Sequence, residues 1–242
     1  MDTVAQVTSP SPRIGMLGGG FMARTHTRAA RLAGAVLGVV GTSGPASSRT
    51  AAAELGYETS AVGADFFEER LDVVHVCSPN STHLDHCLNA LDSGSHIICE
   101  KPLATDSSAA RAILDRAEAR GLSGTVPFVY RYHPMVREAR ARIRRGDAGA
   151  VLTVDARYLQ DWLLDAEDDN WRVDSASGGP SRAFADIGSH LVDLIEFITD
   201  ERIVALSAAT RTAHPRRGGS AVTTEDTVAM TVEMGGGGIG SI

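Results

Sequence analysis

The sequence predicts an α/β fold: a parallel sheet with helices on both faces, followed by an α+β domain with a mostly antiparallel, open sheet. Short apolar runs alternate with helical stretches between residues 13 and 128, and the first of these runs ends in three glycines. The pattern changes after about Val129, where long β-like runs appear. We therefore divide the chain into a flexible tail (1–12), a first domain (13–128) and a second domain (129–242).

In the first domain, strands are expected where apolar runs lie between turn signals, at residues 13–17, 36–40, 71–77, 95–99 and 124–129. Helices are expected over the Ala-rich or amphipathic stretches 21–33, 46–55, 82–91 and 109–120. This alternation implies parallel strands, and sites in parallel sheets lie at the carboxyl ends of the strands. Three features lie directly after the carboxyl end of an expected strand: the glycines 18–20, the turn 78–80 and Lys101.

In the second domain, helices are expected at residues 135–145 and 183–198, and strands at 151–158, 204–212 and 221–233. The run 151–158 alternates between apolar and polar residues, which is typical of a strand with one buried face. A polar loop with two tryptophans separates this strand from the second helix. Long strands joined in this way favour an antiparallel sheet.

Composition and charge narrow the possible functions. The chain has 242 residues, is 43% hydrophobic and carries a formal net charge of −7, as expected for a globular protein with an ample core. Nucleic acid is not an expected partner, because the arginines between residues 137 and 145 alternate as on a solvated helix face. A membrane is not expected either, because no apolar run approaches the roughly 18 residues of a span, and no secretory signal is evident.

Cys77, Cys87 and Cys99 form no CxxC pair. Two of them lie in strand-like runs, where a free cysteine packs as a small hydrophobe. We therefore expect a reducing compartment, a cytoplasmic location and no metal site.

The stretch from Gly18 to Ala23 matches G-x-G-x-x-A between an expected strand and an expected helix. Gly18 permits a tight turn, Gly20 lets the backbone approach a pyrophosphate, and Ala23 lets the helix pack against the strand. The helix N-terminus then faces the phosphates with unpaired N–H groups. The pattern indicates a Rossmann dinucleotide-binding domain; the alternative is a merely flexible turn.

The second strand carries the signal for cofactor choice. An acid at its end would bind the ribose 2′-hydroxyl of NAD. No Asp or Glu occurs between Phe21 and Ala53, and the strand is followed by Thr42 and Ser43, with Arg49 nearby. These residues are suited to a 2′-phosphate, so we favour NADP over NAD. The alternative for Arg49 is an ordinary helix-surface residue.

Three residues are suited to hydride transfer involving an alcohol. Lys101 follows a strand and precedes Pro102, where its cation can stabilise an alkoxide. Asp186 and His190 share a helix face, and Asp193 follows one turn later. Histidine suits proton transfer near neutral pH. The alternatives are a surface lysine, a helix-terminal acid and a structural histidine.

The second domain also offers candidates for substrate contact. The candidates are two aromatic residues and one arginine, Trp162, Trp171 and Arg172, because aromatic faces pack well against sugar C–H surfaces. The alternative is that these residues pack in a core or interface. Gly178 and Gly179 indicate a loop over the site. His83, in the first domain, is a candidate for approaching a nicotinamide or for capping a helix.

Several motifs resemble the Gfo/Idh/MocA oxidoreductases, in the order typical of that family and over nearly the whole chain: residues 18–24 with His26, 77–83, 100–102, 130–134 and 186–193. The resemblance implies sugar or cyclitol substrates and a catalytic set of Lys101, Asp186 and His190. It also implies a cis peptide before Pro102 and a homo-oligomer formed through the second sheet. The expected cofactor-binding residues are Gly18, Gly20, Phe21, Met22, Ala23, Thr42, Ser43, Arg49, Ser78, Pro79, Asn80, His83, Glu100 and Lys101. The expected substrate-binding residues are Lys101, Tyr130, Arg131, Trp162, Trp171, Arg172, Asp186 and His190.

The chain departs from the family pattern in two ways: the acid after the second strand is missing, and family members continue well past Ile242. We therefore expect the second sheet to be incomplete and to expose a strand edge. Either the chain is truncated, or a partner covers this edge. The leading hypothesis is an NAD(P)-dependent oxidoreductase acting on a secondary alcohol of a sugar, cyclitol or related polyol. The alternatives are a catalytically inactive dinucleotide-binding sensor and an NAD-dependent glycoside hydrolase on the same fold.

Overall fold

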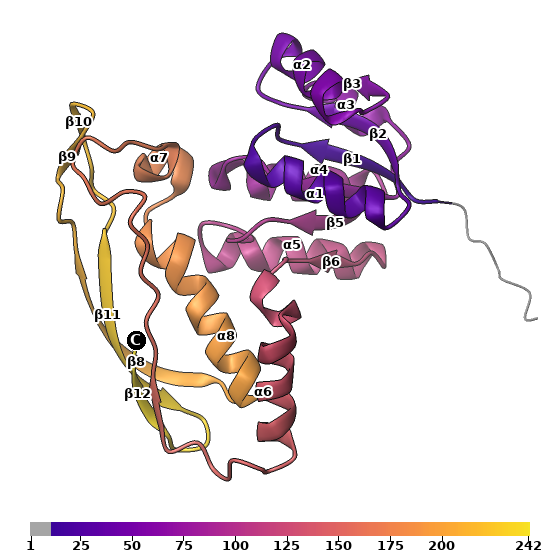
Figure 1. Cartoon of the computed structure of the whole chain (residues 1–242). Coiled ribbons are helices and arrows are strands. Elements are labelled where there is room, and N and C mark those ends of the chain that lie inside the picture. The colour runs from indigo at the N-terminus through magenta and orange to yellow at the C-terminus, as the bar shows by residue number, and fades with distance from the viewer. Residues whose placement is uncertain (1–10) are drawn as a thin grey trace, which may run out of the picture. The chain divides into compact units, whose positions relative to one another are not determined.

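The computed structural model describes residues 11–242, and the chain falls into two compact units that meet in sequence between Val126 and Pro127 (Figure 1). The tail predicted for residues 1–12 lies outside the described residues up to position 10. Within the described part of the chain, no helix has the length and apolar character needed to cross a membrane.

The first unit is built on a six-stranded parallel sheet. Its strands are β1 (Arg13–Leu17), β2 (Val36–Gly41), β3 (Thr59–Ser60), β4 (Val73–Val76), β5 (His96–Cys99) and β6 (Gly124–Thr125). Their order in the sheet is β3-β2-β1-β4-β5-β6, and every neighbouring pair is parallel. The chain runs outward from β1 to β3 and then returns to place β4 on the other side of β1. Ligands of such sheets bind outside the carboxyl ends of the strands at this switch point.

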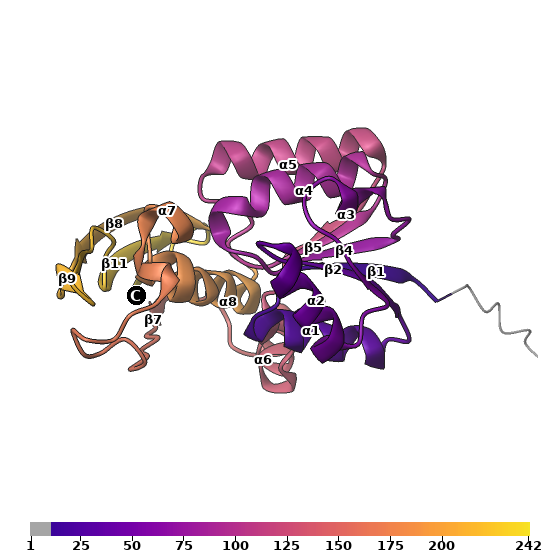
Figure 2. The same ribbon diagram turned by 90° about the horizontal axis from the view of Figure 1, so that it is seen from above.

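Helices cover both faces of this sheet. They are α1 (Phe21–Leu32), α2 (Pro45–Leu55), the short α3 (Asp65–Glu68), α4 (His83–Asp92) and α5 (Ser107–Arg120), with a 3₁₀ turn η1 (Asn80–Thr82) before α4. Figure 2 shows α4 and α5 on one face and α1 and α2 on the other. Local signals fix their ends: the Asp106 carboxylate accepts from the N–H of Ala109 to begin α5, and left-handed Gly121 ends it.

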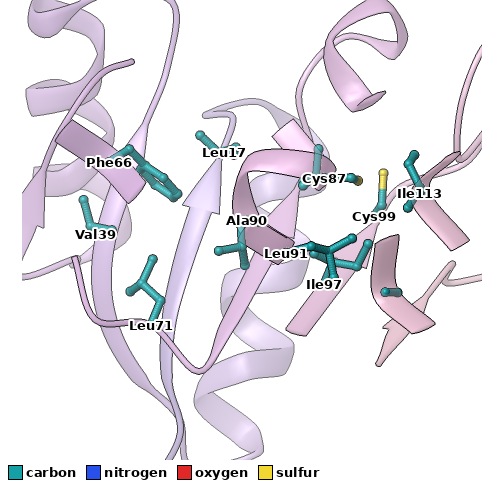
Figure 3. Packing of buried hydrophobic residues seen from close by; sticks show 13 residues of the cluster. Leu17, Val39, Phe66, Leu71, Cys87, Ala90, Leu91, Ile97, Cys99 and Ile113 are labelled. Carbon is teal, nitrogen blue, oxygen red and sulfur yellow. The ribbon is translucent and has the colours of Figure 1, made fainter. Parts of the chain in front are cut away.

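The sheet of the first unit has a core on each face: one lies against α1 and α2, and the other lies against α4 and α5 (Figure 3). Phe66, Cys87, Leu91 and Cys99 are fully buried there. Because strands of a parallel sheet are buried on both faces, β4 contains three apolar residues in four. This core holds the ends of β1, β4 and β5 side by side.

The second unit is a four-stranded sheet packed against helices. Its strands β7 (Thr153–Asp155), β12 (Ile239–Ser241), β11 (Thr227–Met234) and β8 (Ile203–Arg211) lie in that order, antiparallel except for the β7–β12 pair. A small hairpin, β9 (Arg216–Arg217) and β10 (Ser220–Ala221), stands apart. The helical elements are η2 (Val129–Tyr132), α6 (Pro134–Arg144), η3 (Trp171–Val173), α7 (Ser175–Gly178), the π-helical turn η4 (Phe184–Gly188) and α8 (Ser189–Thr199). In Figure 1, α8 lies along the sheet, and its Ile195 packs with Met230, Val232 and Met234 of β11.

The predicted fold class is confirmed, with four local corrections. The strand expected at 151–158 is limited to β7 (Thr153–Asp155), because its partner β12 is only three residues long. The strand expected at 124–129 stops at Thr125, because Pro127 has no N–H to extend the ladder. The run 221–233 divides into β10 and β11, because the carboxylates of Glu225 and Asp226 turn inward to accept backbone N–H groups. The helix expected from residue 183 begins with the π-helical turn η4.

Candidate functional site

The glycine turn lies at the carboxyl end of β1. Gly18 has a φ of +121°, and a Cβ there would lie 2.5 Å from the carbonyl oxygen of Cys77 at the end of β4. Only glycine fits this position, because the turn passes directly against the neighbouring strand. Gly20 differs: a Cβ there would meet no described atom of the first unit within 4 Å. The space above Gly20 is therefore open to a ligand.

Helix α1 begins directly after Gly20, and no side chain of the described residues caps it. Its first turn carries no acid, so its N–H groups suit an anionic ligand. Phe21 is 80% exposed, whereas Ala23 is fully buried against the core formed with β1 and β2. Met22 lies between these extremes. The burial of Ala23 agrees with its expected packing role, and cofactor contact by Phe21 and Met22 stays a prediction.

The end of β2 presents hydroxyl groups rather than an acid. The hydroxyl of Thr42 contacts those of Ser47 and Ser48 and lies 3.4 Å from the carbonyl oxygen of Gly44. Ser43 is exposed, and Arg49 is exposed on the second turn of α2. Thr42 therefore shapes the turn, while Ser43 and Arg49 are accessible to a ligand.

The turn after β4, at residues 78–80, lies at the strand end next to the glycine turn. Its Ser78 hydroxyl lies 2.7 Å from the Thr82 hydroxyl and 3.0 Å from Nδ1 of His86. His83 is fully buried; its Nδ1 lies 2.8 Å from the carbonyl oxygen of Pro102, and its Nε2 lies 3.0 Å from that of Ser78. His83 thus lies behind the turn and connects it to the lysine loop, rather than pointing outward from it.

The lysine loop, residues 100–102, follows β5. The expected cis peptide between Lys101 and Pro102 is confirmed. The Glu100 N–H donates to the carbonyl of Val76 in β4, and the Lys101 N–H donates to the Glu100 carboxylate. The first unit therefore brings together the glycine turn, the Ser78 turn and the lysine loop at three adjacent strand ends.

In the second unit, the substrate-contact candidates gather around Asp186 on η4. The Arg172 guanidinium lies 3.3 Å from the Asp186 carboxylate and stacks over the rings of Trp162 and Trp171, at 5.9 and 4.5 Å from their centroids. A π-helical turn is a frequent feature of functional sites. The four residues predicted separately from the sequence thus form one polar and aromatic cluster.

His190, on α8, lies among aromatic rings. Its ring meets those of Phe128 and Tyr130 edge to face, with centroids 5.8 and 5.1 Å away. The hydroxyls of Tyr130 and Tyr158 are hydrogen-bonded. Burial and the Tyr130 hydroxyl raise the pKa of Tyr158 to about 12. Sequence reasoning missed Tyr158, because its only signal was its place at the end of an alternating run.

Arg131 binds an acidic side chain of its own unit. Its guanidinium forms a bidentate ion pair with the buried carboxylate of Asp193 and lies 5.2 Å from the ring centroid of Phe197. This geometry makes Arg131 a residue that fixes α8 against η2.

In the described part of the chain, no group of three or more His, Cys, Asp or Glu side chains is arranged to hold a metal ion.

A doubly wound sheet with a glycine turn at its switch point, followed by an α+β unit, defines the class of two-domain proteins that bind a dinucleotide on a Rossmann unit. Residues 12–128 match the oxidoreductase family with an NAD-binding Rossmann fold, and residues 136–242 match the Gfo/Idh/MocA C-terminal domain. The chain therefore belongs to the Gfo/Idh/MocA oxidoreductase family, as its motifs predicted.

Named relatives include levoglucosan dehydrogenase from Pseudarthrobacter phenanthrenivorans, 32% identical over 84% of this chain and 55% of the relative. An oxidoreductase domain protein from Kribbella flavida superimposes with a TM-score of 0.91 at 34% identity. A levoglucosan dehydrogenase complexed with NADH and levoglucosan superimposes with a TM-score of 0.90 at 30% identity. Each of these two structures is matched over 96% of this chain and 66% of its own. The present chain thus spans about half the length of the curated relative and two-thirds of the solved chains.

Proposed function

We propose that this chain acts as a nicotinamide-dependent dehydrogenase on a secondary alcohol of a sugar, cyclitol or related polyol. The observation that carries the proposal is the glycine turn at the β1–β4 switch point, with open space above Gly20 and the lysine loop two strands away. The residues present fit a dinucleotide, because the uncapped N-terminus of α1 supplies N–H groups for its phosphates.

The proposed reaction divides the work among three side chains. His190 accepts the proton of the substrate hydroxyl, and Lys101 stabilises the developing alkoxide with its cation. Asp186 orients these groups, and Arg172 holds its carboxylate in place. The bound nicotinamide supplies the acceptor for the hydride released from the carbinol carbon.

The cluster of Trp162, Trp171 and Arg172 supports a sugar-like substrate. Flat aromatic faces pack against the C–H surface of a sugar ring, and a guanidinium binds its hydroxyl oxygens. The similarity to a levoglucosan dehydrogenase points to the same substrate class. We infer a polyol with adjacent hydroxyl groups as the substrate.

For the cofactor, we retain NADP as the preferred form within a nicotinamide dinucleotide site. Ser43 and Arg49 are accessible at the end of β2, where no acid competes with a 2′-phosphate. The similar levoglucosan dehydrogenase structure was solved with NADH, which supports NAD as the alternative.

We also propose a homo-oligomer formed through the second sheet. Strand β8 is an edge of this sheet and exposes Val204 and Leu206 by 64% and 60%. An exposed apolar sheet face beside an unpaired strand edge is suited to contact with another copy. Sedimentation at increasing protein concentration tests this contact, and a monomer throughout would contradict it.

The function is tested by titrating the chain with NADPH and NADH in a calorimeter and then following reduced-cofactor absorbance over a polyol panel. We expect binding of both, tighter for NADPH, and turnover that falls by about 10²–10⁴-fold in His190→Asn. Arg216→Gln, a change of an exposed residue on β9, is the control. Binding without turnover on any polyol would favour a sensor, and binding of neither cofactor would refute the proposal.

A further inference from the structure

Behind the lysine loop lies a chain of three buried polar side chains from three different elements. His75 of β4, His26 of α1 and Glu100 after β5 are 6%, 7% and 8% exposed. Nδ1 of His75 lies 3.0 Å from Nδ1 of His26, and Nε2 of His26 lies 3.0 Å from Oε1 of Glu100. The second carboxylate oxygen, Oε2, accepts the N–H of Lys101 at 3.2 Å. The chain of contacts therefore ends on the backbone of Lys101.

Donor and acceptor chemistry fixes the hydrogen atoms of this chain. An ionised Glu100 carboxylate can only accept, so Nε2 of His26 must carry a hydrogen. When His26 is neutral, its Nδ1 is then an acceptor, and Nδ1 of His75 must be the donor. Burial, and secondarily the nearby His26, lower the pKa of His75 to about 3, so His75 is neutral at neutral pH. Every hydrogen-bonding atom in these three contacts then has a complementary partner.

The carboxylate needs this arrangement because it is buried. A buried charge is tolerated only when it is paired and hydrogen-bonded. The charge of Glu100 reaches the neighbouring side chains: together with the larger effect of burial, it raises the pKa of Cys77. His26 is the side chain that donates to Glu100, and it stands on α1, whose N-terminus faces the glycine turn.

We propose that His26, supported by His75, is a positioning residue that fixes Lys101 by holding the Glu100 carboxylate. The inference rests on the proposed function, in which Lys101 stabilises the substrate alkoxide. It adds a physical link between the helix that receives the cofactor phosphates and the loop that carries the lysine. A change at His26 thus alters the lysine without touching substrate or cofactor.

The sequence offers a selective probe of this link, because Lys101 is the only lysine in the chain. Incorporation of ¹⁵N-lysine therefore gives a single backbone amide signal in the NMR spectrum, the signal of the N–H that donates to Glu100. Its chemical shift and its hydrogen-exchange rate report that bond directly. The measurement needs neither substrate nor turnover.

Two substitutions form a matched pair. In His26→Gln the side-chain amide nitrogen takes the place of Nε2 and can still donate to Glu100, whereas in His26→Asn it lies near the position of Nδ1 and cannot. We expect the Lys101 signal to stay close to its original position in His26→Gln. In His26→Asn we expect a displaced signal and exchange at least about tenfold faster, since a tenfold change corresponds to about 1.4 kcal/mol. His96→Gln, at the exposed start of β5, is the control.

An unchanged signal and exchange rate in His26→Asn would overturn the proposal. If that variant does not fold, the protonation of the His26 ring nitrogens is measured by NMR in the unsubstituted protein instead. The proposal requires a hydrogen on Nε2 of His26 at pH 7, and an unprotonated Nε2 overturns it. In an active enzyme, we expect kcat to fall about 10- to 100-fold in His26→Asn and to recover largely in His26→Gln. Failure of the proposed function would remove this last readout but leave the amide measurement intact.

Discussion

The glycine turn provides the sharpest test of how this fold makes a cofactor site, because two of its glycines have opposite surroundings. At Gly18, an added Cβ would lie 2.5 Å from the Cys77 carbonyl oxygen, in a backbone conformation with φ of +121°. Strain of this kind costs about 1–3 kcal/mol, and forcing a methyl group into packed backbone costs about as much again. We therefore expect Gly18→Ala to lower the free energy of unfolding by about 3 kcal/mol or more.

At Gly20 the reverse holds, since none of the first unit's described atoms lies within 4 Å of an added Cβ and the φ of −84° suits alanine. We expect Gly20→Ala to cost less than about 1 kcal/mol of stability, as for a replaced helix-capping residue. Its methyl group would nevertheless keep a pyrophosphate away from the N-terminus of α1. The loss of one charge-assisted hydrogen bond, worth about 1.5–3 kcal/mol, predicts NADH binding weakened at least about tenfold.

Urea unfolding and calorimetric titration with NADH, applied to both variants, separate the two effects. A Gly18→Ala variant with the unsubstituted protein's urea midpoint would show that β1 and β4 are not packed as closely as the structure indicates. A Gly20→Ala variant that binds NADH within twofold of the unsubstituted protein would show that the phosphates do not lie above Gly20.

Two further predictions concern buried polar groups, one in each unit. Because the folded-state pKa of His75 is about 3, below its ordinary value of 6.5, its contribution to stability is complete above pH 6.5 and is lost as the pH falls towards 3. At one pKa unit per about 1.4 kcal/mol, the loss reaches about 3 kcal/mol at pH 4. His75→Asn keeps a hydrogen-bond donor but does not titrate, so its free energy of unfolding should fall less between pH 6.5 and about pH 4 than that of the unsubstituted protein. An equal fall in both proteins would contradict this. Arg217 is 2% exposed and donates to the carbonyls of Leu163, Asp165 and Asp168. It also forms a buried ion pair with Asp226, so Arg217→Met should destabilise the second unit by about 3–5 kcal/mol. Thermal unfolding and the rate of proteolysis in the 163–168 segment test this prediction, with Arg216→Met as the control. Equal unfolding temperatures and cleavage rates in the two variants would refute it.

The elements that the sequence predicted well are those whose signals are local. Apolar runs such as Val36–Val40, with a turn at each end, read as strands because burial on both faces leaves no polar position. The glycine turn and the lysine loop could be predicted for the same reason, since each follows such a run. By contrast, the strand expected through residue 129 ended early at a proline that the apolar pattern concealed.

Contacts between distant parts of the chain could not be predicted in this way. His26 and His75 are 49 residues apart, and His26 and Glu100 are 74 apart. The sequence pattern gave no reason to pair them, because only the strand order, with β4 between β1 and β5, brings them together. The pairing of Arg172 with Asp186 is of the same kind, since both residues were candidates but no spacing rule connects them.

The buried polar residues of the first unit connect its loops to its helices. His26, His75, His83 and Glu100 are all buried, and their contacts meet at the turn after β4 and the loop after β5. Each polar group loses its water on burial, and apolar side chains of similar volume are often as stable or more so. Its hydrogen bonds are directional, and they tie the loop that carries Lys101 to both α1 and α4, which apolar packing alone would not do.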